Sequence, residues 1–451
     1  GQTITIRKNL REIALKIIND VNTNSAYANI SLDREIKKHE LVSDQDRRFI
    51  TELVYGTVKA GKTIDWILGK YLSRPLKKVS PIIQDILRMG IYQIFFMSKI
   101  PPSAACNQAV ELAKKYGHSG TVKFVNGVLR NAVRSPEKAQ FPDRNTDPEL
   151  FLALTYFHPQ WLIKRWIKKL GFTDTEKLCI FNNSAPPLCL RTNTLKQTRA
   201  ELLKILATEE MEVIASTVVP EGIICLKHPN LSSLESLKQG LFQIQDESSM
   251  LVAHIVAPTE NDIIIDACSA PGGKTTHMAT LMNNTGKIIA TDIYQHKLDK
   301  IKENATKLGL TNIEPTLLDA KLLHTQYQNF ADKVLVDAPC SGLGVIRRKP
   351  DSRWRKEEEL IKELPTLQQE ILNSAAKCVK PGGVLVYSTC TTEEEENQTV
   401  IYQFLQDNKN FQLEVTGQFL PITKTTQELI QIWPHNDKMD GFFIARMKRN
   451  N

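Results

Sequence analysis

The sequence lacks any apolar run long enough to cross a membrane. No stretch of its 451 residues approaches the roughly 18 consecutive apolar residues that a membrane-spanning helix requires. Its hydrophobic share of 41% and its charged share of 24% are those of an ordinary globular protein. The chain is too long for one compact core, so we expect a multidomain, soluble, cytoplasmic protein with no membrane partner.

Clustered cysteines are missing as well. The 8 cysteines are scattered, and the sequence contains no C-x-x-C pair and no Cys/His group at the spacing of a zinc site. Disulfide frameworks belong mainly to small secreted domains, so we expect free thiols in a reducing compartment. The sequence therefore predicts no metal site.

The positive charge is unevenly distributed along the chain. Residues 1–145 contain 24 Lys and Arg against 13 Asp and Glu, whereas the remaining residues contain 34 against 37. A basic segment joined to a near-neutral one is typical of a nucleic-acid-binding arm beside a separate working domain. An ordinary solubilising surface is the alternative interpretation.

The basic segment is predicted to be entirely helical. Leu10, Ile13, Ile17 and Val21 recur at helical spacing, and residues 82–96, 103–116 and 121–133 continue the pattern. We expect a helical domain over residues 1–140, followed by a proline-containing linker. Residues 145–240 mix two predicted helices, 161–170 and 199–209, with short strands near 187–193, 213–219 and 222–226, which indicates a small α+β domain.

Residues 241–451 show a different pattern. Short apolar runs at 262–267, 287–292, 333–338 and 384–388 alternate with helical or loop segments. Buried parallel strands have this appearance, so we predict a doubly wound α/β sheet of the Rossmann-like kind. The acidic run Glu393–Glu396 is predicted to open a helix, where carboxylates favour the helix dipole.

Ligands of such sheets bind at the carboxyl ends of the strands. The first strand ends in a turn whose paired glycines allow close approach of a ligand, and Asp292 and Asp319 end the next two strands. A carboxylate at the end of the second strand is suited to ribose hydroxyls. The pattern favours a nucleoside-type cofactor near the two acids and the glycine turn, whose residues are Cys268, Ser269, Ala270, Pro271, Gly272, Gly273 and Lys274.

Two cysteines follow two further predicted strands. Cys340 comes three residues after Asp337, and Cys390 ends the run Tyr387-Ser-Thr-Cys390. A lone cysteine is usually a small buried apolar residue. Two cysteines at the ends of neighbouring strands are expected to face the same crevice.

These motifs resemble those of a known enzyme family. Asp266–Thr275, Asp337–Gly344 and Ser388–Cys390 resemble the signature motifs of RNA cytosine-5 methyltransferases of the Sun family. The segments 242–248 and 439–446 resemble that family's opening motif and closing strand. Residues 107–117 and 123–130 resemble the NusB RNA-binding fold, so the resemblance covers nearly the whole chain.

The resemblance implies three domains: an all-α NusB-like domain, a small α+β domain and a Rossmann-like methyltransferase domain. It implies S-adenosylmethionine as cofactor, bound by the Cys268–Lys274 loop with Asp292, Asp319 and Asp337. It also implies that Cys390 attacks carbon 6 of a cytosine and that Cys340 assists breakdown of the adduct. The expected substrate is small-subunit ribosomal RNA, and we expect a monomer.

A basic run follows the Cys340 loop. Arg347, Arg348 and Lys349 are predicted to hold RNA phosphates together with Arg353 and Arg355, and Trp354 is predicted to stack on a base. The alternative is a solvated loop with a half-buried tryptophan. For the whole chain, the open alternatives are methylation of transfer RNA or DNA, and a non-catalytic RNA-binding assembly factor.

Overall fold

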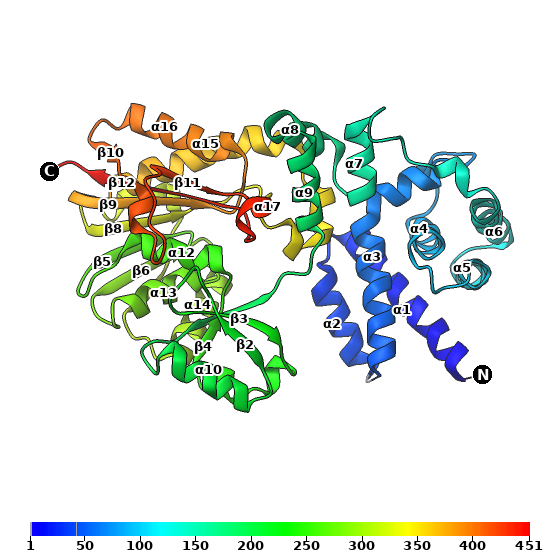
Figure 1. Cartoon of the computed structure of the whole chain (residues 1–451), viewed down its shortest axis with the longest axis horizontal. Coiled ribbons are helices and arrows are strands. Elements are labelled where there is room, and N and C mark those ends of the chain that lie inside the picture. Colours follow the sequence, from blue (N-terminus) through cyan, green and yellow to red (C-terminus); the bar gives the residue numbers. More distant parts are fainter. Residues whose placement is uncertain (1, 42) are drawn as a thin grey trace. The chain divides into compact units, whose positions relative to one another are not determined.

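The computed structural model describes residues 2–41 and 43–451 (Figure 1). Two compact units divide these residues. The helical unit contains the described residues up to Asn183 together with Lys349–Lys356, and the sheet unit contains Ser184–Arg348 and Glu357–Asn451. The domain boundaries at 1–140, 145–240 and 241–451 stay a prediction. In the part of the chain that the structure describes, no helix is long and apolar enough to span a bilayer.

The helical unit confirms the predicted all-α first segment. Prolines at the first turns of α4 and α5 and the Ser43 side chain, which caps α3, mark where helices begin. Leu10, Ile17 and Val21 are buried in its core, as their helical spacing predicts. Its helices are α1 (Gln2–Asn24), α2 (Ala28–Lys38), α3 (Asp44–Leu68), α4 (Pro81–Phe96), α5 (Pro102–Tyr116), α6 (Ser119–Arg134), α7 (Pro148–Tyr156), α8 (Gln160–Leu170) and α9 (Phe172–Asn182).

A small antiparallel sheet opens the sheet unit. Its strand order is β2-β3-β1-β4, and it contains β1 (Leu188–Thr192), β2 (Glu212–Ala215), β3 (Gly222–Lys227) and β4 (Phe242–Ile244) with the helices α10 (Arg199–Thr208) and α11 (Glu235–Lys238). The strand predicted over 213–219 ends early at Ala215. The hydroxyl of Ser216 accepts hydrogen bonds from the backbone N–H groups of Val218 and Val219, which turns the chain there.

The large sheet has the strand order β10-β12-β9-β8-β5-β6-β7, with β11 paired to β12. The five strands from β7 to β9 are parallel, which confirms the predicted doubly wound arrangement, and β10, β11 and β12 extend it antiparallel. The strands are β5 (Ile263–Ala267), β6 (Lys287–Asp292), β7 (Ile313–Leu317), β8 (Ala331–Asp337), β9 (Val379–Thr389), β10 (Phe411–Leu413), β11 (Leu429–Ile432) and β12 (Phe442–Arg449).

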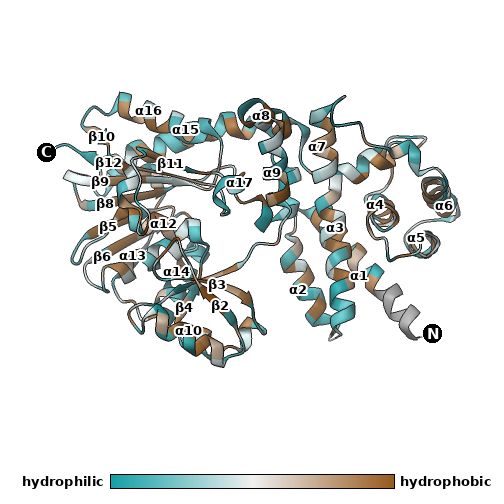
Figure 2. Ribbon diagram, viewed as in Figure 1, coloured by the Kyte–Doolittle hydropathy of each residue, from teal (hydrophilic) through white to brown (hydrophobic). Residues whose placement is uncertain are grey.

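Helices cover both faces of this sheet, and its central strands β5, β6 and β8 are mostly hydrophobic (Figure 2). On β8, Val334 and Val336 pack in the core with α15 and α16, whereas Leu335 packs in the core with α12, α13 and α14. Burial of successive residues on opposite faces explains the continuous apolar runs. The covering helices are α12 (Glu247–Val256), α13 (Gly273–Leu281), α14 (Gln295–Leu308), α15 (Glu358–Ala376) and α16 (Gln398–Asp407), and α17 (Pro434–Asp437) precedes β12.

The strand order places a topological switch point at β5. From β5 the chain proceeds to β6 and β7 on one side, and then crosses to β8 and β9 on the other. The loops after β5, β6 and β8 therefore diverge at one edge of the sheet, where ligands of such folds bind. All of the predicted site residues end or follow these strands and their neighbours β7 and β9.

Candidate active site

The loop between β5 and α13 contains the glycines that the sequence analysis selected. The φ angles of Cys268 and Gly272 are positive, at 59° and 99°, so the chain turns sharply between strand and helix. A Cβ atom on Gly272 would also lie 3.0 Å from Cγ1 of Ile301. The positive φ angle thus favours glycine at this position, and a side chain there would also press on Ile301. The first turn of α13 follows directly, with backbone N–H groups that have no partner within the helix.

A cavity of about 630 Å³ lies at this edge of the sheet. Among the predicted site residues, those that line it are Cys268, Ala270, Asp292, Asp319, Asp337, Cys340 and Cys390. Apolar side chains of Ile293, Tyr294 and Leu318 complete one wall. The predicted loop residues that do not line it are Ser269, Pro271, Gly272, Gly273 and Lys274; Ser269 is buried, and its hydroxyl donates to the carbonyl of Thr291.

Backbone hydrogen bonds hold the two acids at the strand ends. Asp292 accepts from the N–H of Tyr294 at 3.0 Å, and Asp319 accepts from the N–H of Lys321 at 2.9 Å. The carboxylates are therefore fixed locally, and both line the cavity. Two acids beside a glycine turn and an apolar wall are suited to the ribose and base of a nucleoside.

The two cysteines on the wall of this cavity lie in contact with each other. The Sγ atoms of Cys340 and Cys390 lie 3.2 Å apart, because the neighbouring parallel strands β8 and β9 end side by side. The hydrogen bond to Cys340 and burial raise the pKa of Cys390 well above its ordinary value. Burial, together with the surrounding aspartates, also raises the pKa of Cys268. The predicted pairing of Cys340 and Cys390 in one crevice is confirmed.

Asp337 is held from two sides. Lys274 Nζ donates to it at 2.9 Å, and the Ser388 hydroxyl donates to its other oxygen at 2.9 Å. Burial by itself lowers the pKa of Lys274, but the adjacent carboxylate more than compensates, so the net shift of that pKa is upward. Lys274 is thus a charged partner of Asp337. Its positive charge does not bring the pKa of Cys390 below the ordinary value.

Arg191 supports the glycine turn from within the sheet unit. Its guanidinium donates to the Gly273 carbonyl at 2.7 Å, to the Thr276 hydroxyl at 2.9 Å and to Gln245 Oε1 at 2.6 Å. Burial lowers the pKa of Arg191 to about 9. The sequence analysis missed this role, because nothing local to residue 191 indicates a contact with residue 273.

Three family models match successive parts of the chain. Residues 253–448 match the model of the 16S rRNA methyltransferase RsmB/F family, residues 8–134 match the NusB family, and residues 158–231 match the ferredoxin-like domain of RsmF/B-like methyltransferases. A probable ribosomal RNA small subunit methyltransferase B of Bacillus subtilis is 40% identical over 98% of this chain and 99% of its own length. The chain belongs to the RsmB/F family of 16S rRNA methyltransferases.

Other relatives of this RsmB/F family member are similar over their full length. Ribosomal RNA small subunit methyltransferase B of Shewanella oneidensis is 35% identical, covering 97% of this chain and 99% of that protein. The crystal structure of PH0851 superimposes with a TM-score of 0.81 at 27% identity, covering 98% of each chain. NSun6 from Pyrococcus horikoshii with SFG has a TM-score of 0.59 at 26% identity, covering 65% of this chain and 98% of that one. The predicted fold class and family resemblance are confirmed.

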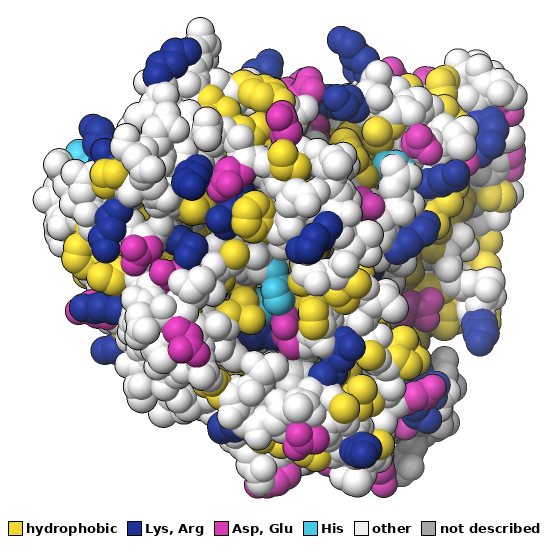
Figure 3. Space-filling model, turned by 60° about the vertical axis from the view of Figure 1, so that its left-hand side comes forward, with side chains coloured by type: hydrophobic (Ala, Val, Ile, Leu, Met, Phe, Trp, Pro, Cys, Tyr) yellow, Lys and Arg dark blue, Asp and Glu magenta, His cyan; other side chains and the backbone are white. Residues whose placement is uncertain are grey.

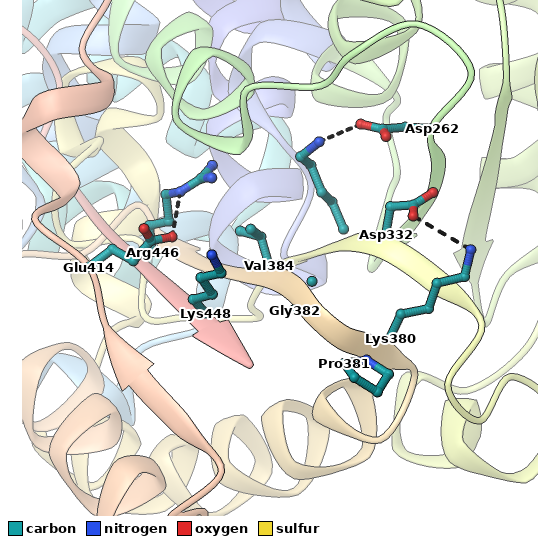
Figure 4. Close-up of a pocket in the computed structure, with 11 residues that line it drawn as sticks. Asp262, Asp332, Lys380, Pro381, Gly382, Val384, Glu414, Arg446 and Lys448 are labelled. Atoms are coloured by element: carbon teal, nitrogen blue, oxygen red, sulfur yellow. Dashed lines mark hydrogen bonds and ion pairs between the residues drawn. The ribbon is translucent and has the colours of Figure 1, made fainter. Parts of the chain in front are cut away.

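A second cavity, of about 380 Å³, lies among charged side chains at the amino ends of the parallel strands (Figure 4). Three ion pairs cross it: Lys333–Asp262, Lys380–Asp332 and Arg446–Glu414. Each of its three carboxylates is therefore paired with a cation, and Lys448 lines the cavity as well. Ligands of doubly wound folds bind at the carboxyl ends, so we assign this cavity to the structure of the sheet rather than to a site.

Three further side chains of the sheet unit come together outside the cavity. Glu221 Oε1 lies 2.5 Å from Nε2 of His254 and 3.1 Å from Nε2 of His277, and their possible ligand atoms all lie within 4.8 Å. Burial, with the charge of Arg191, lowers the pKa of His277 to about 4, although the hydrogen bond to Glu221 opposes this shift. Both imidazoles thus face the same carboxylate oxygen of Glu221. The positive charge of Arg191 beside it opposes a second cation.

Three arginines of the basic run after Cys340 have partners within their own unit. Arg347 and Arg348 both pair with the buried carboxylate of Asp440 in the sheet unit. In the helical unit, Arg353 is 0% exposed, and Trp354 Nε1 donates to the Lys59 carbonyl at 2.9 Å. The prediction that Arg353 holds a phosphate is therefore wrong. The stacking of the half-buried Trp354 on a base and the phosphate contacts of the exposed Lys349 and Arg355 stay predictions.

Lysines and arginines do not gather into one patch on the face drawn in Figure 3. They are dispersed among acidic and apolar side chains there. The excess positive charge of the first 145 residues thus does not identify an RNA-binding surface on this face. The predicted RNA-binding role of the helical unit stays a prediction.

Arg353 is expected to be essential for the stability of the helical unit. Its guanidinium donates to the Phe157 carbonyl at 2.9 Å, to Asn183 Oδ1 at 2.7 Å and to the Asn182 carbonyl at 3.3 Å. Arg353→Ala leaves these buried acceptors without a donor, which costs about 3 kcal/mol or more of unfolding free energy. Denaturant unfolding of the full chain measures the loss.

Arg355→Ala is the matched control for this variant. The Arg355 side chain is 31% exposed and donates to the Ala26 carbonyl at 2.9 Å, so water replaces its lost contacts. We expect a loss of about 1 kcal/mol or less for it. Equal losses from Arg353→Ala and Arg355→Ala would contradict the anchoring role of Arg353.

Proposed function

We propose that the chain methylates carbon 5 of a cytosine in small-subunit (16S) ribosomal RNA, with S-adenosylmethionine as methyl donor. The observation that carries this proposal is the pair of sulfur atoms of Cys340 and Cys390, 3.2 Å apart, on the wall of the cavity that also contains Asp292 and Asp319. The relatives named as ribosomal RNA small subunit methyltransferase B support the substrate class. The complex of NSun6 with SFG, an analogue of S-adenosylmethionine, supports the cofactor.

The residues of the cavity fit this cofactor. We assign the ribose hydroxyls to Asp292 and the adenine amino group to Asp319, because carboxylates accept from both kinds of donor. The apolar wall of Ile293 and Leu318 suits the faces of the base, and Cys268 and Ala270 bring the glycine turn to the cavity. When bound, S-adenosylmethionine supplies an electrophilic methyl group beside the two cysteines.

The cysteines then carry out covalent catalysis on the base. Carbon 5 of cytosine is a poor nucleophile while the ring is aromatic, so the Cys390 thiolate first forms a bond to carbon 6. The electron pair released to carbon 5 takes up the methyl group. Loss of the carbon 5 proton, for which we assign the Cys340 sulfur as acceptor, then restores the double bond as the bond between carbon 6 and sulfur breaks and Cys390 departs as a thiolate. We assign to Cys340 the assistance of this last step, because its sulfur lies 3.2 Å from the departing one.

Asp337 is assigned to the edge of the base and to the cofactor. Its carboxylate lines the cavity and is oriented by Lys274 and Ser388. A target base must leave its helix to expose carbon 6, and an oriented acceptor then holds its exocyclic amino group. The NusB-like helical unit is assigned to the flanking RNA. Action as a monomer in the cytoplasm stays a prediction.

Asp292→Asn is expected to weaken the binding of S-adenosylmethionine by about 10- to 100-fold, because it removes charged hydrogen bonds to the ribose. Isothermal titration calorimetry measures the dissociation constant directly. Asp299→Asn is the control, since Asp299 lies on α14 and accepts only a local bond from Gln295 among its observed hydrogen bonds. Unchanged affinity in Asp292→Asn would contradict the ribose assignment.

The rate of adduct formation is expected to rise with pH. The raised pKa of Cys390 keeps its sulfur mostly protonated near neutrality, and only the thiolate attacks. The rate should increase about tenfold per unit from about pH 7 to about pH 9 in single-turnover experiments. The hydrogen bond to Cys340 is the largest cause of the raised pKa, so Cys340→Ala should shift the profile to lower pH. A pH-independent rate would contradict this account.

Mass spectrometry of nucleosides from 16S rRNA tests the proposed function in cells. Strains with and without the gene should differ by one 5-methylcytosine in small-subunit ribosomal RNA. Restoration of the intact gene should restore the mark. Loss of the mark from transfer RNA instead would assign the enzyme to another RNA, and no change in any RNA would favour a non-catalytic assembly factor.

A further inference from the structure

The buried carboxylate of Glu396 joins the two cysteine loops of the sheet unit. Its side chain lies at the end of a short 3-10 turn, Glu394–Glu396, and is 0% exposed. One oxygen accepts from the backbone N–H of Ser341 at 2.8 Å. The other accepts from the hydroxyls of Ser341 at 2.7 Å and Thr391 at 2.8 Å. Gln368 Nε2 contributes a fourth, longer bond of 3.3 Å.

The three shorter of these bonds are donated by the residues that directly follow the two cysteines. Ser341 comes after Cys340, and Thr391 comes after Cys390. Their hydroxyl oxygens also lie 2.9 Å from each other. The Glu396 side chain thus holds both loops at the residue that directly follows each reacting cysteine.

The backbone that carries this carboxylate is itself held in place. The Tyr387 hydroxyl donates to the Glu396 carbonyl at 2.6 Å, and the Asn397 amide donates to the Thr391 carbonyl at 2.9 Å. Glu396 therefore has little freedom to move away from the loops. Burial raises its pKa, and the four hydrogen bonds oppose that shift. An ionised acceptor fits the donors, because all four bonds are donated to it.

We infer that Glu396 is a positioning residue that keeps the sulfur atoms of Cys340 and Cys390 in contact. It does not line the cavity, so it is not assigned a contact with substrate or cofactor. The inference rests on the proposed function for its purpose, since two cysteines that act in turn on one base must stay adjacent. The distance between the sulfur atoms can, however, be tested without any methyl transfer.

Formation of a disulfide between Cys340 and Cys390 is the test. Diamide, an azodicarboxamide oxidant, converts the two thiols to a disulfide and takes up the two protons and two electrons. Mass spectrometry of peptides from the quenched full-length protein gives the rate. The parent should couple rapidly because the sulfur atoms already lie 3.2 Å apart. A parent that fails to couple would overturn the inference.

Glu396→Ala should slow this coupling on the order of 100-fold, the size of effect expected when reacting groups lose alignment by about 1 Å. Glu396→Gln keeps one acceptor for the Ser341 N–H, and the hydroxyls can turn to accept from its amide, so we expect only about a tenfold loss or less. Glu394→Gln is the control, because that carboxylate is exposed on the same turn. It should couple at the parental rate.

Coupling at the parental rate in a folded Glu396→Ala protein would contradict the positioning role. If that variant does not fold, Ser341→Ala and Thr391→Val each remove one donor and should slow coupling by smaller factors; parental rates in both would overturn the inference. A parent that couples normally but transfers no methyl group would refute the proposed function alone.

Discussion

Cys390→Ala is expected to abolish methyl transfer and to form no covalent complex with RNA. The reaction as proposed begins with attack by this sulfur, and without it carbon 5 of cytosine has no route to become nucleophilic. Removal of a covalent nucleophile costs on the order of 10⁴-fold or more in turnover. Single-turnover transfer of labelled methyl groups from S-adenosylmethionine to a 16S rRNA transcript measures the loss.

Two observations make this result interpretable. Cys390→Ala should still bind S-adenosylmethionine, because Asp292 and the glycine turn are unchanged. Cys225→Ala serves as the matched thiol control, since Cys225 lies on β3 in the small sheet and packs in that sheet's own core. It should retain methyl transfer. Substantial turnover by Cys390→Ala would contradict the assigned nucleophile.

Cys340→Ala is expected to accumulate a covalent protein–RNA complex. Cys390 can still attack and the methyl group can still transfer, but the partner sulfur that assists release is missing. The adduct should therefore persist through denaturing electrophoresis, whereas the parent should show almost none. Turnover should fall on the order of 10²-fold or more, in line with the loss of a positioned proton-transfer group.

The opposite pair of results would make Cys340 the nucleophile. Enzymes that methylate cytosine in DNA use the cysteine of a Pro-Cys motif as nucleophile, and Cys340 follows Pro339 here. If Cys340→Ala formed no adduct while Cys390→Ala trapped one, the two roles would be exchanged. The double variant should form none in either case.

Much of this site could be predicted because its signals are local. Each buried parallel strand is a short apolar run, and the residues that follow a strand must lie at the carboxyl edge of the sheet. Cys268, Asp292, Asp319, Cys340 and Cys390 were therefore expected in one crevice, and all of them line the same cavity. The helices of the helical unit could be predicted equally well, from the helical spacing of their apolar residues.

The long-range partners of charged residues could not be predicted. The run at Arg347–Arg355 indicated a nucleic-acid surface, because a sequence shows charge but not what faces it. Asp440 neutralises Arg347 and Arg348, and backbone carbonyls more than 150 residues away accept from Arg353. Likewise, Glu396 belongs to an acidic run expected to open a helix, yet its carboxylate is buried against Ser341.

The division of the chain into two units could not be predicted from the sequence either. Residues Lys349–Lys356 belong to the helical unit although their neighbours on both sides belong to the sheet unit. Such a crossing depends on packing of Arg353 and Trp354 against residues near 58 and 157, which no periodicity indicates. The antiparallel pairing of β10 and β11 with β12 is similarly set by contacts between distant segments.

Peptide mapping of the covalent complex tests the central claim most directly. RNA containing 5-fluorocytosine at the target position cannot lose a proton from carbon 5, so the complex with the parental enzyme should be stable after methyl transfer. Digestion and mass spectrometry should find the methylated nucleotide attached to the peptide that contains Cys390. Attachment to Cys340, or the absence of any cross-linked peptide despite methylation of unmodified RNA, would contradict the account.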